Sequence, residues 1–138
     1  MKDIEAIAKD VLDISVRLHR DLGPGLLESV YEAILAAKLS SFGYAVARQR
    51  AIDIEFEGLR FDAAFRIDLL IEESLLIEIK SVERLSPAHA KQLLTYLRLT
   101  KQTLGLLINF GGATLMEGVR RLANNYNPVA SSRRCANK

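Results

Sequence analysis

The chain has 138 residues, of which 49% are hydrophobic and 26% charged, so its composition is that of one globular domain and not of a disordered chain. Its 19 Lys and Arg residues against 17 Asp and Glu residues give a net charge of +2, too small to indicate nucleic-acid binding by itself. The single cysteine, Cys135, excludes an internal disulfide framework and a zinc site built from several cysteines.

Two helices are predicted at the start of the chain. Apolar residues recur with helical spacing over residues 3–20, and Asp3 is a suitable N-cap. The break Gly23-Pro24-Gly25 precedes a second apolar stripe, which begins at Leu26 and ends near Gly43. Glu28 lies in the first turn of this second helix, where an acid interacts favourably with the helix dipole.

Strands follow, because the hydrophobic period changes to two from Tyr44 onward. A half-exposed strand covers residues 52–56, and Glu57-Gly58 is a turn signal. The next strand region covers residues 59–71 and is expected to bend near Ala63-Ala64. Its last part, Arg66 to Ile71, forms a predicted β-hairpin with Leu75 to Lys80 around a Glu-Glu-Ser turn.

The remaining elements surround one buried strand. Ser86-Pro87 is typical of a helix start, and this helix is expected to end near Thr100. The continuous apolar run over residues 104–110 indicates a strand buried on both faces. A last short helix is expected over residues 114–124. The order α-α-β-β-β-β-α-β-α predicts an α/β fold with a mixed sheet flanked by helices.

Three charged residues interrupt the predicted hairpin. Strand side chains alternate between faces, so Glu78 and Lys80 share a face, and Asp68 on the neighbouring strand can lie close to them. Buried charges must pair or hold a metal. In one interpretation Asp68, Glu78 and the carbonyl of Ile79 supply the oxygen ligands that Mg²⁺ prefers, and Lys80 holds or deprotonates a water for phosphodiester hydrolysis. In the other, Asp68 and Lys80 form a structural ion pair.

The predicted helix after Ser86 carries a polar stripe of His89, Gln92 and Tyr96, spaced three and four residues apart. Such donors could orient phosphate or the attacking water. Gln92 and Tyr96 could equally mark the border of an amphipathic helix, and His89 is better explained as a surface or capping residue.

Four segments in order resemble the PD-(D/E)XK nuclease superfamily, which has the restriction-endonuclease-like fold. Asp68 and Glu78-Ile79-Lys80 match its central pattern, and a helix with Gln92-x-x-x-Tyr96 is similar to that of its exonuclease branch. A closer resemblance is to the small GxxExxY family within it, through Gly25-Leu-Leu-Glu28-Ser-Val-Tyr31 and the two segments Gln92-Leu-Leu-Thr-Tyr-Leu and Gly105-Leu-Leu-Ile-Asn-Phe110.

The resemblance implies a metal-dependent nuclease acting on DNA or RNA. Asp68 and Glu78 would bind Mg²⁺ or Mn²⁺, and Glu28 would complete the metal shell, directly or through water. Lys80 would activate or position the water, with Gln92 and Tyr96 as auxiliary site residues. The proline that names the superfamily's first motif is absent, because Arg66-Ile67 precedes Asp68. Arg66 could contact phosphate or neutralise the acid.

Further expectations concern the domain and its partners. We expect one nuclease-like domain over residues 1–125 and a basic tail over residues 126–138, which could contact phosphates or be a solvated end. With no signal-like segment and no apolar run of about 18 residues, we expect a cytoplasmic protein without membrane association. A non-cleaving module that binds nucleic acid or a protein remains the alternative function, and a homodimer would enlarge the small surface.

Overall fold

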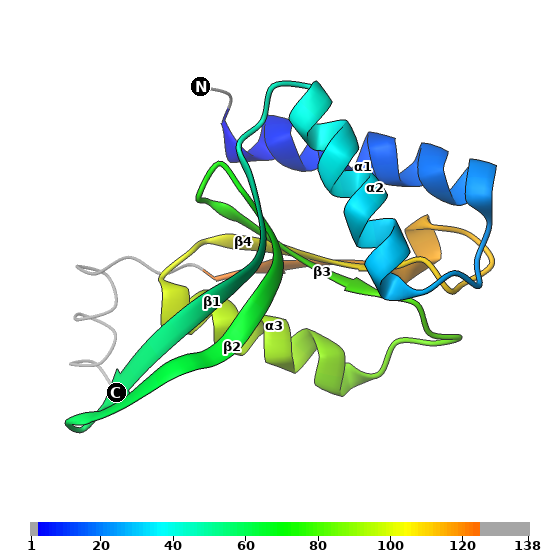
Figure 1. The fold of residues 1–138 in the computed structure, drawn as a ribbon. Helices are drawn as coiled ribbons and strands as arrows, with labels where there is room; N and C mark the ends of the chain where they lie inside the picture. The colour runs from blue at the N-terminus through cyan, green and yellow to red at the C-terminus, as the bar shows by residue number, and fades with distance from the viewer. Residues whose placement is uncertain (1–2, 125–138) are drawn as a thin grey trace.

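The computed structural model describes residues 3–124. Two helices are followed by three strands, and α3 then lies between β3 and β4, in an α/β fold (Figure 1). Their bounds are α1 Ile4–Leu22, α2 Glu28–Ser41, β1 Val46–Phe56, β2 Leu59–Ile71, β3 Leu75–Lys80, α3 Pro87–Thr100, β4 Leu104–Asn109, the 3₁₀ turn η1 Met116–Gly118 and β5 Val119–Ala123.

The five strands form one mixed sheet in the order β1-β2-β3-β4-β5. Only β3 and β4 are parallel, and the other neighbours are antiparallel. A parallel pair needs a crossover connection, which α3 provides. Helices α1 and α2 lie on one face of the sheet and α3 lies on the other (Figure 1). The predicted mixed sheet flanked by helices is therefore confirmed.

Two hydrophobic cores separate these layers. The larger core joins α1 and α2 to strand residues such as Ile77 and Ile79. The smaller core joins Leu93 and Leu97 of α3 to the opposite face of the sheet, where Leu76 lies. The alternation of Leu76, Ile77 and Ile79 between the cores places Glu78 on the α3 face, as the period of two requires.

Strands β1 and β2 form a long twisted hairpin that projects past the rest of the sheet (Figure 1). Strand β2 is continuous but irregular at Ala63, whose φ is 50°, which agrees with the predicted bend. Residues near the turn are exposed, whereas the last part of β2 is buried between its neighbours. Only that last part contributes to the cores.

The capping and turn predictions agree with the structure. The Asp3 carboxylate accepts the Ala6 N–H at 2.9 Å and so caps α1. Helix α3 begins at Pro87, with Ser86 and His89 in a reciprocal capping box, so His89 is a capping residue. Strand β4 is buried along its whole length.

Two predictions about element order are wrong. Three strands precede α3, not four, because Leu59–Ile71 is one strand that runs through the bend. Residues 114–124 form η1 and β5 instead of a helix, because this segment pairs with the free edge of β4, from Leu104↔Ala123 to Ile108↔Val119. The predicted tail over residues 126–138 lies outside the described residues. Within residues 3–124, no helix combines the length and apolar character needed to cross a membrane.

Candidate active site

Asp68 and Glu78 meet where β2 separates from β3. The pairing of these strands ends at Leu69↔Ile77, one residue short of both acids. Residues two apart on a regular strand share a face, yet Ile67 packs in the α3-side core and Leu69 in the opposite core. The strand is therefore irregular at Asp68, and this irregularity turns its carboxylate toward β3.

The Asp68 carboxylate replaces the missing strand pairing. Its Oδ2 accepts the Ile79 N–H at 2.8 Å, and its Oδ1 accepts a hydrogen bond from Gln49 Nε2 at 3.0 Å. The N–H and C=O groups of one strand residue point to the same side of the strand. The Ile79 carbonyl therefore points toward Asp68 as well, as the sequence-based interpretation requires of a third oxygen ligand.

Glu78 is almost completely buried, with 6% of its surface exposed. Its Oε1 lies 3.4 Å from the Asp68 N–H. Burial, followed by the charge of Asp68, raises the pKa of Glu78 to about 8, and the charge of Lys80 opposes part of this shift. Among residues 3–124, no basic side chain lies within ion-pair distance of Asp68 or Glu78. The alternative of an Asp68–Lys80 ion pair therefore does not describe these side chains.

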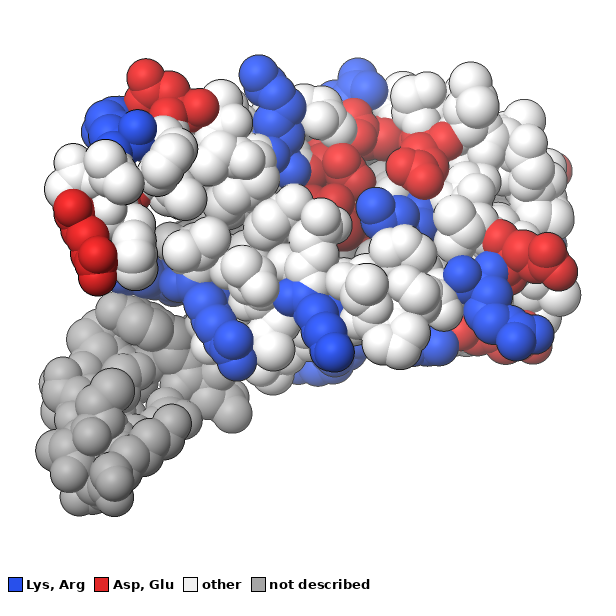
Figure 2. Space-filling model, turned by 90° about the horizontal axis from the view of Figure 1, so that it is seen from below, with Lys and Arg blue, Asp and Glu red and all other residues white. Residues whose placement is uncertain are grey.

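Lys80 ends β3 on the same face as Glu78 and is half-buried. The α3 side of the molecule shows a group of acidic side chains near the middle of the view, with basic side chains beside it and a further row of them along the lower edge (Figure 2). An ammonium at this position acts on Glu78 through space without contacting it.

Helix α3 brings Tyr96 to the acids but leaves Gln92 in solvent. The Tyr96 ring stacks on Phe65 of β2 at 4.0 Å between centroids. Burial and then the charges of Glu78 and Asp68 raise the pKa of the Tyr96 hydroxyl, so this group lies within the field of both acids. The Gln92 side chain is exposed and makes no hydrogen bond to another described residue.

Glu28 lies at the end of β3, where its Oε2 accepts the Ser81 N–H at 3.3 Å. The neighbouring loop is fixed by Ser81 Oγ, which donates to the Leu26 carbonyl at 2.7 Å, and by Tyr31, whose hydroxyl donates to the Gly23 carbonyl at 2.5 Å. Tyr31 itself is buried and stacks on Phe110. The residues of the Gly-x-x-Glu-x-x-Tyr motif therefore fix the start of α2 against β3.

The helix acid closest to Asp68 in the hydrogen-bond network is Glu32, which the sequence-based interpretation did not include. Glu32 is 6% exposed, and its Oε1 accepts a hydrogen bond from Gln49 Nε2 at 2.6 Å. Its Oε2 pairs with Arg48 at 3.1 Å. Glu32 follows Glu28 by four residues, so both acids lie on one side of α2. This spacing is the sequence signal from which Glu32 could have been included in the site. Arg66 donates to the Gln49 carbonyl at 3.3 Å and makes no ion pair with Asp68.

The oxygen atoms of Asp68, Glu78 and the Ile79 carbonyl suit a hard divalent cation. Two carboxylates without a cationic partner and one strand carbonyl are oxygen ligands, and Mg²⁺ commonly takes one or two protein carboxylates and completes its octahedron with waters. Within residues 3–124, no group of three or more His, Cys, Asp or Glu residues is placed to hold a metal. Glu28 therefore does not join Asp68 and Glu78 in a three-acid cluster, and its expected contact through water stays a prediction.

Comparison with known proteins shows the family of the chain. The family model of the PD-(D/E)XK nuclease superfamily matches residues 5–122. A solved structure described as "Crystal structure of SSO0001" is 21% identical, with a TM-score of 0.43, and the match covers 89% of this chain and 67% of that one. No curated protein matches the chain. The match runs from within α1 to within β5 and includes every residue of the candidate site, and the chain belongs to the PD-(D/E)XK nuclease superfamily.

Proposed function

We propose that this protein is a metal-dependent phosphodiesterase that cleaves DNA or RNA, and that it belongs to the GxxExxY group of its superfamily. The observation that carries the proposal is the pair of adjacent carboxylates, Asp68 and Glu78, of which Glu78 is buried and neither has a cation within ion-pair distance among the described residues. A buried acid in this state favours a cation as its partner. The family match supports nuclease chemistry as the use of that cation.

Asp68, Glu78 and the Ile79 carbonyl are the groups that would hold Mg²⁺ or Mn²⁺, with Glu28 contributing through water. When bound, such a cation neutralises charge on the phosphate oxygens and activates a water. Asp68 is held ready by hydrogen bonds to both of its oxygens. Because each carboxylate oxygen has two lone pairs, these bonds leave acceptor capacity for a ligand.

Lys80 is the residue we assign to the attacking water. Its ammonium lies on the same strand face as Glu78, where it can donate a hydrogen bond to the water or to the phosphate as negative charge develops. The Tyr96 hydroxyl keeps its proton at neutral pH, because its pKa is raised, and can therefore donate to a phosphate oxygen. Gln92 is exposed one turn earlier on α3 and can contact the same strand of nucleic acid.

The charge of α3 supports a polyanionic substrate. This helix contains no acidic residue, and Lys91 and Arg98 on it are exposed. Neither side chain forms an ion pair with another described residue. Such cations neutralise backbone phosphates and give sequence-independent affinity.

A non-cleaving module is the second candidate. The observation that favours it is the lack of a third acidic metal ligand within residues 3–124, together with the Glu28 carboxylate being bonded to Ser81. A domain of this kind would keep nucleic-acid affinity without metal dependence. Titration with Mn²⁺ by calorimetry separates the two functions, because the nuclease requires a bound cation and the module does not.

The test is cleavage of single- and double-stranded DNA and RNA with Mg²⁺ or Mn²⁺. We expect Glu78→Ala and Lys80→Ala each to lower the rate by at least about 100-fold, the range that removal of an acid, base or charge-stabilising group produces. Lys38→Ala is the matched control, because Lys38 is an exposed helical lysine on the opposite layer. Cleavage that survives both site substitutions would reject the assignment.

A further inference from the structure

Two consecutive residues of β1 contact the same buried carboxylate. Arg48 Nε donates to Glu32 Oε2 at 3.2 Å, and Gln49 Nε2 donates to Glu32 Oε1 at 2.6 Å. Consecutive side chains of a regular strand point to opposite faces, so this contact requires a break in the strand. Gln49 supplies the break, because its φ is 50° and it has no registered partner between Arg48↔Leu69 and Arg50↔Ile67.

The Gln49 amide joins two acids that come from different layers. A single nitrogen, Nε2, lies 2.6 Å from Glu32 of α2 and 3.0 Å from Asp68 of β2. An amide nitrogen carries two hydrogens, so each carboxylate can receive one. Arg48 balances the charge of Glu32, and Gln49 connects that ion pair to Asp68 without adding charge.

The backbone conformation at Gln49 also bears on the choice of residue at this position. A positive φ is unfavourable for a residue with a Cβ and persists only where the surrounding contacts require it. Glycine would relieve this conformation, yet the position carries a long amide whose one nitrogen reaches both acids. The side chain, and not the turn of the backbone, is therefore the feature that this position provides.

We propose that Gln49 is a positioning residue that sets the orientation of the Asp68 carboxylate for metal binding, and that Glu32 and Arg48 hold Gln49 in place. The inference rests on the proposed function, because it concerns the affinity of Asp68 and Glu78 for a divalent cation. The Ile79 N–H fixes one Asp68 oxygen and Gln49 fixes the other, so the carboxylate cannot rotate away from Glu78. Hydrogen-bond partners of metal ligands contribute to affinity in this way.

The experiment is Mn²⁺ titration by calorimetry of the intact chain and three variants. Gln49→Ala and Gln49→Gly are expected to weaken Mn²⁺ binding by about 10–100-fold. Gln49→Gly also removes the backbone strain, so its thermal midpoint is expected to equal or exceed that of the wild type. The control is Gln102→Ala, because Gln102 Nε2 makes a similar bond, 3.0 Å to the Glu73 carbonyl, and is expected to leave Mn²⁺ affinity unchanged.

Each outcome has a separate meaning. Weaker binding by folded Gln49→Gly, with unchanged binding by Gln102→Ala, supports the positioning role, because a purely structural residue would not lower affinity while stability is kept. Wild-type affinity in both Gln49 variants overturns the inference and leaves the proposed function intact. Absence of Mn²⁺ binding by the wild type overturns the proposed function itself, and the inference with it.

Discussion

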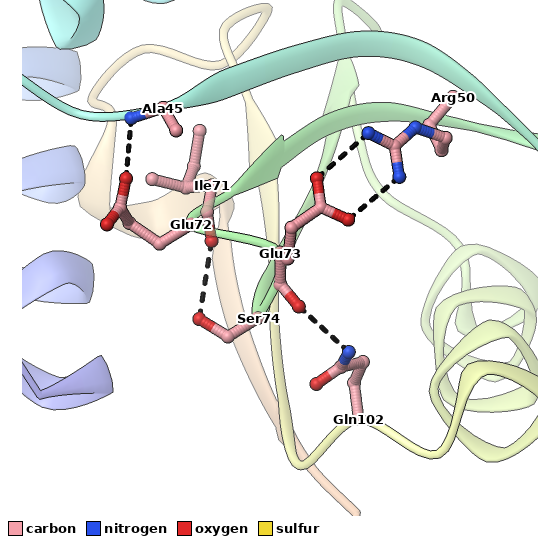
Figure 3. Close-up of polar contacts among 7 residues, drawn as sticks. All are labelled: Ala45, Arg50, Ile71, Glu72, Glu73, Ser74 and Gln102. Atoms are coloured by element: carbon pink, nitrogen blue, oxygen red, sulfur yellow. Dashed lines mark hydrogen bonds and ion pairs between the residues drawn. The ribbon is translucent and has the colours of Figure 1, made fainter.

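The β2–β3 hairpin carries acidic side chains at both ends, and their surroundings differ. At the turn, Glu73 forms a two-pronged ion pair with Arg50 at 2.9 and 2.8 Å, and Glu72 accepts the Ala45 N–H at 2.6 Å (Figure 3). At the open end, Asp68 and Glu78 lie side by side without a cation within ion-pair distance among the described residues. The acid Glu73 at the turn is therefore neutralised by an ion pair, whereas Asp68 and Glu78 at the open end are not.

The pKa values of the two ends move in opposite directions. The Arg50 guanidinium lowers the pKa of Glu73, whereas burial and the neighbouring Asp68 raise the pKa of Glu78 to about 8. At the turn, Glu73 is exposed and is stabilised as an anion by Arg50. At the open end, Glu78 is buried, and a negative charge on it destabilises the fold.

The largest expected effect is a pH dependence that Glu78→Gln removes. The folded, metal-free protein binds a proton at Glu78 between pH 4.5, the ordinary pKa, and pH 8, so its stability falls as the pH rises through this range. A shift of this size corresponds to at most about 5 kcal/mol. Urea unfolding at pH 5 and pH 9 should show this fall in the wild type and a flatter profile in Glu78→Gln. Equal pH dependence in both proteins would contradict the cause assigned to the open end.

At the turn, the contribution of Glu73 to stability should depend on pH with the opposite sign to that of Glu78. Because its pKa is lowered, Glu73 stabilises the fold above its ordinary pKa of 4.5 and loses that contribution as the pH falls. Glu73→Gln is therefore expected to reduce stability slightly at pH 7 and to leave the fall between pH 5 and pH 9 unchanged. Urea unfolding of this variant alongside Glu78→Gln shows whether the two ends behave independently.

A second effect, of intermediate size, is stabilisation by divalent cations. A ligand at about 100 times its dissociation constant stabilises a folded protein by about 2.7 kcal/mol, so Mn²⁺ should raise the thermal midpoint of the wild type. Glu78→Gln should abolish the rise, because it removes one of two carboxylate ligands. Glu73→Gln should retain it, and loss of the rise in that variant as well would show that the cation binds elsewhere.

The smallest expected effect is the coupling of Arg50 to Glu73. Both side chains are substantially exposed, and surface ion pairs contribute about 0–1 kcal/mol that salt screens. A double-mutant cycle of Arg50→Ala and Glu73→Ala should give a coupling below about 1 kcal/mol that decreases in 1 M NaCl. A coupling of several kcal/mol would contradict this prediction and show that the ion pair at the turn contributes strongly to stability.

Particular residues show what local pattern could predict and where it failed. Asp3, Ser86-Pro87 and the apolar run of β4 were interpreted correctly, because capping and burial act within a few residues. Residues 114–124 were predicted as a helix because their apolar spacing is short and ambiguous, and pairing with the edge of β4 made them a strand instead. This pairing depends on a partner strand outside the segment, so the segment itself carries little signal for it.

The candidate site likewise contains residues that the sequence predicted and residues that it did not. Alternation within β3 was enough to place Glu78 and Lys80 on one face, and the polar turn was enough to bring Asp68 near them. Gln49 and Glu32 were missed, because their role depends on a positive φ in β1 and on the packing of α2 beside that strand. The four-residue spacing of Glu28 and Glu32 places both acids on one side of α2, but no periodic pattern in β1 indicates that Gln49 contacts Glu32.

The amino-acid sequence by itself determined the mixed sheet, its crossover helix and the three charged residues at the centre of the site, because period, capping and turn chemistry are local properties. Only the tertiary structure decided the electrostatic state of those residues. Burial between two cores, the end of the β2–β3 pairing and the approach of Gln49 come from segments far apart in the chain, and together they leave Asp68 and Glu78 without a cationic partner among the described residues.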